Sequence, residues 1–580
     1  MGYEWAVTSY IGRRLKMVID ISKEKVIGTV ESVDTATVVV RVNNPDLLSA
    51  VQVNHLVIIR SSKVGQHLIG MVNKIVRKYD PQSDNIDDEE IRTYDVVKIT
   101  LVGTFIEKQG TNENVFKRTL QSVAEINADC FTMSAETLSS FMNVISQSNA
   151  MCENPLKIGR FTLNDTALAY LDGNKFFQRH AVITGSTGSG KSYTVASLVE
   201  QIAKLKSANA ILFDIHGEYT SIVGESIKHY KIAGPGDVSD NGIMFLPYWL
   251  LSYEEMISML LDRSDNNAPN QAAMFSRSVL DEKRKYLVEK GKKDIEAQFT
   301  IDSPIPYEMS GVIDFLKKKD IEMVPGSTKP KQGDYYGKLS RFIQRLENKI
   351  TDKRLNFMFS EDPTLLKYDY MVKLCEMLLA PASNGGGVKI VDFSEVPSDI
   401  LPLIVSLIAR VIFSVQQWMN RETIHPIALL CDEAHLYVPE NARQGVEASS
   451  LSSFERIAKE GRKYGVSLVV ITQRPSEVNR TVLSQANNFI AMRLTNVDDQ
   501  NVIKRLLPDN LGDYAELLPI LDVGEAIIVG DACLLPSRIV VDEPEHKPNS
   551  ATVDFWDEWS KECVEDLIGE AVEALRKQSR

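Results

Sequence analysis

Eight consecutive residues, 185–192, have the types and spacing of a phosphate-binding loop. They read Gly-Ser-Thr-Gly-Ser-Gly-Lys-Ser and fit the pattern GxxxxGK[ST]. Glycines let such a backbone curl until its N–H groups point at phosphate oxygens, and the positive end of the following helix adds to the attraction. Lys191 can reach the β- and γ-phosphates, and the Ser192 hydroxyl can ligate Mg²⁺. The residues expected to hold ATP are therefore Gly185, Ser186, Thr187, Gly188, Ser189, Gly190, Lys191, Ser192 and Tyr193.

The motif needs a strand before it and a helix after it. The apolar run 180–184 precedes the loop, and 193–203 follows with the apolar spacing of a helix. A chance match would lack this context.

An acidic pair, Asp432 and Glu433, follows the apolar run 427–431. At the end of a buried strand, Asp432 would hold Mg²⁺ through water, and Glu433 would polarise the attacking water. A carboxylate beside the metal-binding acid favours hydrolysis over transfer to a second substrate, so the pair indicates an ATPase rather than a kinase. The alternative is an ordinary acidic turn.

Three further polar residues are candidates for catalysis. Gln473 ends the apolar run 466–472, where it would sit between the two motifs, sense the γ-phosphate and position water; a strand cap is the alternative. Arg456 and Arg462 lie in a predicted helix, 454–463, whose basic face would meet a neighbouring subunit's nucleotide. Solvated surface is the alternative for both arginines.

The elements that must position these residues form an α/β pattern. Short, continuous apolar runs at 180–184, 210–214, 427–432 and 466–472 alternate with helical sequence, which predicts a parallel sheet covered on both faces. Residues 1–150 differ, because short β-branched runs separated by turn formers predict a small β-barrel.

Two segments stand outside this pattern. Residues 251–370 are helical and charged; between 281 and 354 there are 17 basic and 13 acidic residues, a net of +4. This segment is either a solvated insertion or a surface for nucleic acid or a partner. The C-terminal tail predicts an amphipathic helix with a stripe of Phe555, Trp559, Cys563, Leu567, Ala571 and Leu575.

Composition narrows the class of protein. A chain of 580 residues should hold about three domains. Its net charge of −13 argues against a surface that binds nucleic acid throughout, so any DNA contact must be local. Six scattered cysteines without CxxC suit a reducing cytoplasm. No apolar run of roughly 18–20 residues and no signal-peptide pattern are seen, so no membrane is expected.

With these segments in order, the chain resembles the HerA family of hexameric DNA-translocating ATPases, relatives of FtsK. Five segments carry the likeness, and they span about 180–500: residues 179–180 (Arg-His), 214–219 (Asp-Ile-His-Gly-Glu-Tyr), 246–249 (Leu-Pro-Tyr-Trp), 432–435 (Asp-Glu-Ala-His) and the block 454–496.

The resemblance implies a RecA-like core in a ring of six, with nucleotide between protomers and double-stranded DNA in the central pore. It favours Arg456, with Arg462 second, as the arginine that acts in trans. It also places Arg179, Asp214 and Glu218 near the nucleotide, without fixing their roles. The C-terminal helix would brace the adjacent subunit.

HerA proteins commonly work with a partner docked on the barrel. In archaea the partner is the NurA nuclease in DNA end resection; in bacteria, nuclease or sirtuin-like NAD-hydrolysing effectors serve in antiphage defence. This chain has no visible nuclease constellation, so an effector activity would come from another chain. The acidic stretch 84–90 departs from the family and leaves the partner open.

The expected domains are a β-barrel with linker at 1–150, a first core part at 151–250, a helical insertion at 251–370, a second core part at 371–545 and a brace helix at 546–580. Two functions fit best: an ATP-driven motor on double-stranded DNA, or a nucleotide-dependent scaffold ring that activates an effector with little translocation. A monomeric signalling NTPase is a third, weaker fit.

Overall fold

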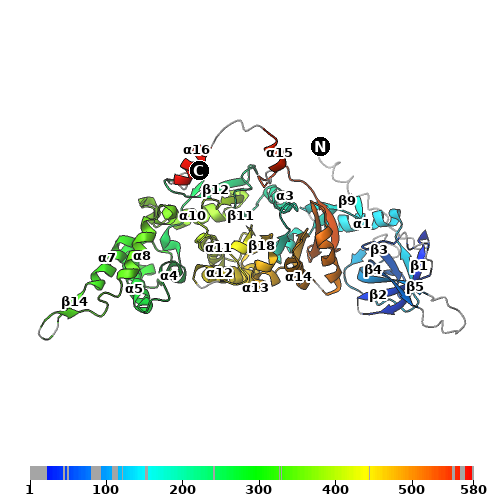
Figure 1. Cartoon of the computed structure of the whole chain (residues 1–580), viewed down its shortest axis with the longest axis horizontal. Helices are drawn as coiled ribbons and strands as arrows, with labels where there is room; N and C mark the ends of the chain where they lie inside the picture. Colours follow the sequence, from blue (N-terminus) through cyan, green and yellow to red (C-terminus); the bar gives the residue numbers. More distant parts are fainter. Residues whose placement is uncertain are drawn as a thin grey trace, which may run out of the picture. The chain divides into compact units, whose positions relative to one another are not determined.

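The computed structural model describes residues 23–34, 36–43, 46, 48, 51–79, 93–106, 115–120, 122–150, 154–238, 242–325, 327, 329–442, 445–507, 509–550, 555–561 and 568–577 (Figure 1). The acidic stretch 84–90 lies outside these residues, as do Cys563 and Leu567 of the tail stripe. The chain divides into two compact units, one of 1–176 with 488–542 and one of 177–487 with 543–580. The expected domain boundaries fall at other points and stay predictions.

The first unit contains the expected β-barrel. Its strands run in the order β2-β1-β7-β3-β4-β5-β6, and an antiparallel pairing of β2 with β5 closes the barrel. Valine and isoleucine side chains such as Val38, Val40 and Ile99 fill the interior. The strands are β1 (Val26–Val33), β2 (Thr37–Val42), β3 (Leu56–Arg60), β4 (Gln66–Tyr79), β5 (Thr93–Ile106), β6 (Val115–Lys117) and β7 (Asp129–Thr132).

The same unit holds a second antiparallel sheet, made from segments far apart in the chain. Its order is β19-β20-β21-β8-β9. Its strands are β8 (Leu156–Phe161), β9 (Asn164–Leu171), β19 (Asn488–Met492), β20 (Glu525–Gly530) and β21 (Ser537–Val541). The first unit also contains the helices α1 (Ala135–Ala150) and α14 (Val497–Leu506).

The second unit is built on the predicted parallel sheet, in the order β13-β12-β16-β11-β17-β18-β10. All the recorded pairings in it are parallel. Every residue of β10, β11, β17 and β18 is buried, which explains their continuous apolar sequence. The strands are β10 (Ala181–Thr184), β11 (Ala210–Asp214), β12 (Ile227–Ile232), β13 (Ile243–Met244), β16 (Val388–Asp392), β17 (Ile427–Cys431) and β18 (Val466–Thr472).

Three helices of this unit matter for the site: α3 (Lys191–Ala203), α11 (Leu401–Trp418) and α12 (Val446–Glu460). In the described part of the chain, α11 alone is long and apolar enough to cross a membrane by length and composition, which the sequence analysis did not anticipate. It is nonetheless a core helix, because 72% of it is buried in the fold. Its Arg410 forms an ion pair with the buried Glu255 (Nε to Oε1, 2.7 Å).

The insertion is helical, as expected, but it also contains a short β-hairpin that the sequence analysis did not predict. Its helices are α4 (Tyr253–Leu260), α5 (Ala268–Glu289), α6 (Lys293–Glu296), α7 (Met309–Asp320), α8 (Ser340–Thr351), α9 (Asn356–Phe359) and α10 (Tyr370–Leu379). Between α7 and α8 lie two short strands, β14 (Met323–Val324) and β15 (Lys331–Gln332).

The described residues of the C-terminal tail form two short helices, α15 (Phe555–Trp559) and α16 (Ile568–Lys577). Bracing of an adjacent subunit by this tail stays a prediction. Phe555 and Trp559 pack edge to face (5.7 Å between ring centroids), and both side chains are exposed.

Candidate nucleotide-binding and hydrolysis site

The phosphate cradle connects the end of β10 to the start of α3. Gly188 (φ 74°) and Gly190 (φ 102°) have left-handed backbones that L side chains rarely adopt, so glycine is required at both positions. A Cβ on Gly188 would meet nothing within 4 Å, so the surface above it is open. The Ser189 hydroxyl is buried and has no hydrogen-bond partner among the described residues. An open glycine loop at a helix N-terminus fits a phosphate group.

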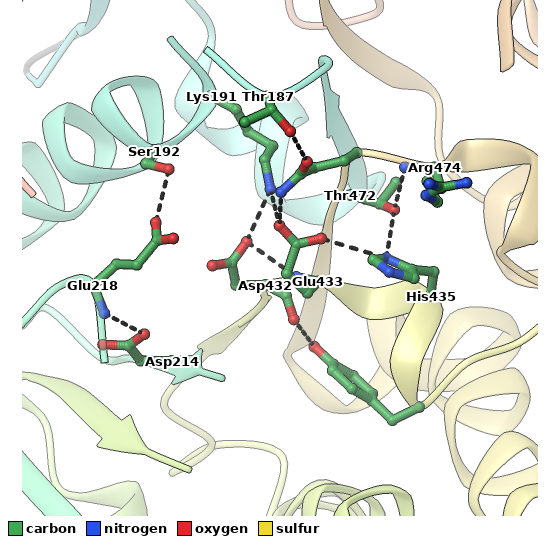
Figure 2. Close-up of polar contacts among 12 residues, drawn as sticks. Thr187, Lys191, Ser192, Asp214, Glu218, Asp432, Glu433, His435, Thr472 and Arg474 are labelled. Carbon is green, nitrogen blue, oxygen red and sulfur yellow. Dashed lines mark hydrogen bonds and ion pairs between the residues drawn. The ribbon is translucent and has the colours of Figure 1, made fainter. Parts of the chain in front are cut away.

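Lys191 lies buried between the cradle and the acidic pair (Figure 2). Its Nζ is 2.5 Å from Glu433 Oε1 and 3.5 Å from Asp432 Oδ1. Burial lowers the pKa of Lys191, but the carboxylates of Asp432 and Glu433 outweigh burial and hold the pKa above its ordinary value. The lysine therefore stays charged and neutralises the acids.

Gln473 joins the cradle to Glu433, because β18 lies between β10 and β17. Its Nε2 donates to Glu433 Oε1 (2.6 Å), and its Oε1 accepts from Thr187 Oγ1 (2.6 Å). In the structure, Gln473 lies between the two motifs. Its role toward water stays a prediction.

The two carboxylate oxygens of Glu433 differ in their hydrogen bonds. Oε1 accepts hydrogen bonds from Lys191 and Gln473, whereas Oε2 is buried without a hydrogen-bond partner in the described structure. The nearest cation candidate for Oε2 is His435 Nδ1 at 3.3 Å. Burial lowers the pKa of His435, so this imidazole is neutral near pH 7. Oε2 is thus available to accept a proton from water.

The backbone at Glu433 is strained. Its φ of 45° and ψ of 45° are left-handed, which costs a non-glycine residue on the order of 1 kcal/mol or more. Neighbouring contacts hold this turn: Glu433 N donates to Asp432 Oδ1 (3.0 Å), and the Tyr437 hydroxyl donates to the Asp432 carbonyl (2.8 Å). In this turn the Glu433 carboxylate lies beside Lys191.

Asp214 and Glu218 border the site, as the resemblance implied. Ser192 Oγ donates to Glu218 Oε2 (3.0 Å), and Asp214 accepts the backbone N–H groups of Glu218 (3.0 Å) and Tyr219 (2.9 Å). Asp214 therefore shapes the loop that places Glu218 against Ser192. Burial raises the pKa of Asp214 to about 7, and the nearby acids Asp432 and Asp392 add to that rise.

The donor set fits Mg²⁺ bound together with nucleotide. Ser192 offers a hydroxyl and Asp432 a carboxylate, and Mg²⁺ prefers such oxygens while taking several of its ligands from substrate phosphates. Among the described residues, no group of three or more His, Cys, Asp or Glu side chains is placed to hold a metal by itself. The metal would thus depend on the nucleotide for further ligands, and would neutralise charge on the phosphates.

The three predicted arginines lie away from the cradle. Arg179 precedes β10, and Arg462 is in the turn that precedes β18, so both lie at the edge where the parallel strands begin. The cradle follows the opposite ends of the strands. Arg456, on the exposed face of α12, donates to Gln417 Oε1 (3.0 Å) and lies 5.0 Å from the ring of Phe413. Their roles at a nucleotide stay predictions. Because they lie away from the cradle of their own chain, they could reach only a nucleotide bound to a second protomer.

Two sets of positioning residues were missed from the sequence. His180 has a left-handed backbone (φ 54°); its Nδ1 accepts from Leu468 N (2.9 Å), and its Nε2 lies 3.1 Å from the Ala458 carbonyl oxygen. It ties β10 to β18 and α12, and its place beside Arg179 in a family segment was the available signal.

The other missed set belongs to the segment 543–549, which crosses α3 and the loop after β11. Glu200 on α3 accepts the backbone N–H groups of Glu545 (2.9 Å) and His546 (2.7 Å). Asn549 N donates to the carbonyl of Glu218 (2.7 Å). No pattern in the sequence pointed to these contacts.

Comparisons with known proteins agree with this geometry. Residues 156–412 match the family described as "Helicase HerA, central domain". The DNA double-strand break repair helicase HerA of Saccharolobus solfataricus is 29% identical over 394 residues, which cover 66% of this chain and 68% of that protein. A probable DNA double-strand break repair helicase HerA of Methanocaldococcus jannaschii is 26% identical over 437 residues, covering 70% and 79%.

Solved structures are more distant. The bacterial conjugative coupling protein TrwB has a TM-score of 0.45 and 13% identity, covering 70% of this chain and 93% of that chain. VirB4 of Thermoanaerobacter pseudethanolicus has a TM-score of 0.44 and 16% identity, and the match covers 68% of this chain and 98% of that chain. One TrwB structure holds ADP and Mg²⁺.

The parallel sheet, the phosphate cradle and the acidic pair together define a P-loop ATPase. Residues 156–412 match the central domain of the HerA family, and about two thirds of the chain aligns with HerA helicases. The resemblance stated from the sequence motifs is therefore confirmed.

We expect Glu433→Gln to lower kcat for ATP hydrolysis by about 100-fold or more, because it removes the carboxylate that takes the proton. ATP binding should persist, since the cradle is intact. Gln473→Ala should lower kcat less, because Lys191 still holds Glu433. Steady-state phosphate release and equilibrium binding of a fluorescent ATP analogue measure both. The control is Glu477→Gln, whose carboxylate is exposed and pairs with Arg474 (3.0 Å); wild-type turnover by Glu433→Gln would contradict the assignment.

Asp214 should make folding stability depend on pH. Its folded pKa of about 7 lies above the unfolded value near 3.9, so between these values the folded chain holds a proton that the unfolded chain has lost. Stability therefore falls as pH rises from about 4 to about 7. Relative to wild type, Asp214→Asn should gain up to about 1.4 kcal/mol per pH unit over this range. Urea unfolding without nucleotide measures it, with exposed Asp399→Asn as control; parallel wild-type and Asp214→Asn profiles would refute it.

Proposed function

We propose that this chain is an ATP-driven motor that works as a ring of six on double-stranded DNA. The proposal that the chain hydrolyses ATP rests mainly on Glu433. Its Oε2 has no hydrogen-bond partner in the described structure, while its Oε1 is held by the charged Lys191 and by Gln473. The proposal of a DNA substrate is supported by the relatives, which are named as DNA double-strand break repair helicases.

The contacts of Lys191 suggest an order of events. When ATP enters, the ammonium group of Lys191 would turn from Glu433 to the β- and γ-phosphates. Ser192 and Asp432 would hold Mg²⁺, which would offset charge on the phosphates. Gln473 keeps Glu433 beside the γ-phosphate. Water then attacks the γ-phosphorus, the bond to the leaving ADP oxygen breaks, and the water proton passes to Glu433.

A shared site between neighbours is supported by the position of the arginines. Arg456 is exposed, and Arg179 and Arg462 lie at the edge of the sheet opposite the cradle. In a ring, such an edge can face the nucleotide of the next protomer. We assign Arg456 to this role first and Arg462 second, with Arg179 near the same phosphates.

A second function deserves a direct test. The net charge of −13 and a barrel of the kind that serves as a docking surface favour a scaffold ring that assembles an effector with little translocation. In either case we propose a cytoplasmic protein, with a nuclease or a sirtuin-like NAD-hydrolysing enzyme on the barrel, in DNA end processing or antiphage defence.

Duplex DNA should stimulate ATP hydrolysis by this protein at least several-fold. The stimulation should fall steeply as salt rises, because DNA contacts release counterions. Phosphate release with and without a linear duplex, across a salt series, measures it. A hexamer on a sizing column that hydrolyses ATP without any response to DNA would favour the scaffold, and a monomer with nucleotide bound would refute both rings.

Mixing inactive chains should restore activity if the site is shared. Lys191→Ala removes the cradle's cation but keeps Arg456, whereas Arg456→Ala keeps the cradle. We expect each variant alone to be nearly inactive, and the mixture to exceed the sum of the two. Arg462→Ala in the same mixture distinguishes the two arginines, and exposed Arg284→Ala is the control. Wild-type rates from both Arg456→Ala and Arg462→Ala would contradict a trans arginine.

A further inference from the structure

A short β-hairpin at the end of the helical insertion takes no part in the nucleotide site. In it, β14 pairs antiparallel with β15, Met323 opposite Gln332 and Val324 opposite Lys331. Figure 1 shows β14 projecting from α7 and α8, away from α11 and α12. A two-stranded sheet that packs on little else is marginally stable in water. Packing within the insertion therefore does not explain why the chain contains this hairpin.

The base of the hairpin is nevertheless firmly anchored. Asp320, at the end of α7, is buried; its carboxylate accepts from Leu339 N (2.7 Å) and Ser340 Oγ (2.5 Å). The Asp320 carbonyl accepts from Gly337 N (2.9 Å), and the Glu322 carbonyl accepts from Gly333 N (2.8 Å). These bonds tie the ends of α7 and α8 together and hold the hairpin out in one orientation.

Positive charge is concentrated on this part of an acidic chain. Residues 317–345 contain eight basic and three acidic residues, a net of 8 − 3 = +5, against −13 for the whole chain. Two of the three acids are already used: Asp320 is buried at the hairpin base, and Glu322 pairs with Lys319 (2.7 Å). The excess positive charge therefore faces solvent.

Most of these cations have no acidic partner. Lys317, Lys319 and Arg345 form ion pairs, with Glu347, Glu322 and Asp262. The remaining five form no ion pair in the part of the chain that the structure describes, although Arg341 is one of the groups that lower the pKa of Asp265. All five are exposed: Lys318, Lys329, Lys331, Lys338 and Arg341. Unpaired, outward-facing cations of this density attract a polyanion.

We propose that the hairpin and the adjoining end of α7 bind the phosphate backbone of double-stranded DNA, a contact separate from the ATPase core. The inference rests on the proposed DNA motor. A two-stranded ribbon fits the major groove of B-DNA, and lysines act as point charges toward phosphates. Four of the five unpaired cations are lysines, a residue depleted from protein–protein interfaces. DNA is therefore favoured over an acidic protein.

The test uses the full-length chain with Lys318→Gln, Lys329→Gln and Lys331→Gln combined. Binding to a labelled linear duplex of arbitrary sequence is followed by fluorescence anisotropy from about 50 to about 200 mM salt. If all three lysines contact phosphates, the slope of log K against log salt should fall by about 2.7. The wild type would then lose about 40-fold more affinity than the variant over this range.

A matched control removes the same charge elsewhere in the insertion. Lys290→Gln, Lys292→Gln and Lys293→Gln alter three exposed lysines at the junction of α5 and α6, and should leave the slope as in wild type. ATP hydrolysis without DNA should be equal in all three proteins. A hairpin variant with the wild-type slope, or an equal loss in the control, overturns this inference and leaves an acidic protein as the partner. A wild type that fails to bind duplex DNA would instead defeat the proposed motor.

Discussion

The site depends on one buried ion pair, between Lys191 of the cradle and Glu433 after β17. A buried charge without a partner is costly, and removing one member of such a pair usually destabilises a protein by about 3–5 kcal/mol. Lys191 and Glu433 lie 242 residues apart in sequence, yet their charged atoms are 2.5 Å apart. The fold must therefore bring the ends of β10 and β17 to one place, and the strand order does so with only β18 between them.

The same edge of the sheet concentrates negative charge. β11 and β16 end in Asp214 and Asp392, and Asp432 follows β17 directly. Burial raises the pKa of Asp214 to about 7, and repulsion by Asp432 and Asp392 adds to the rise. Lys191 is the buried cation that relieves this charge, so the site is organised around a positive centre. A Mg²⁺–triphosphate complex can replace that arrangement, because it brings its own cation to the acids and offers phosphates to the lysine.

Much of this could be predicted from the sequence, for identifiable reasons. Strands buried on both faces need continuous apolar runs, and the cradle needs glycines at fixed spacing, so both leave local signals. The pairing of Glu433 with Lys191 and the crossing of 543–549 over α3 leave none, because they depend on which strands become neighbours. His180 left one signal, its place beside Arg179, but nothing in the sequence indicated its contacts with β18 and α12. The hairpin of β14 and β15 was missed because its strands have two residues each, too few for a periodic pattern.

The two edges of the parallel sheet differ in charge in a way that bears on assembly. Acids and the cradle lie where the strands end, whereas Arg179, Arg462 and Lys463 lie where β10 and β18 begin. In the described residues Lys191 is the lysine that pairs with the acidic pair, and an arginine beside the nucleotide would add a second cation that raises the rate. An edge rich in cations and an edge rich in acids are complementary surfaces, and in a cyclic arrangement each protomer offers one to each neighbour. This difference in charge supports the proposal that the phosphate cradle is one half of a site completed by a neighbouring protomer.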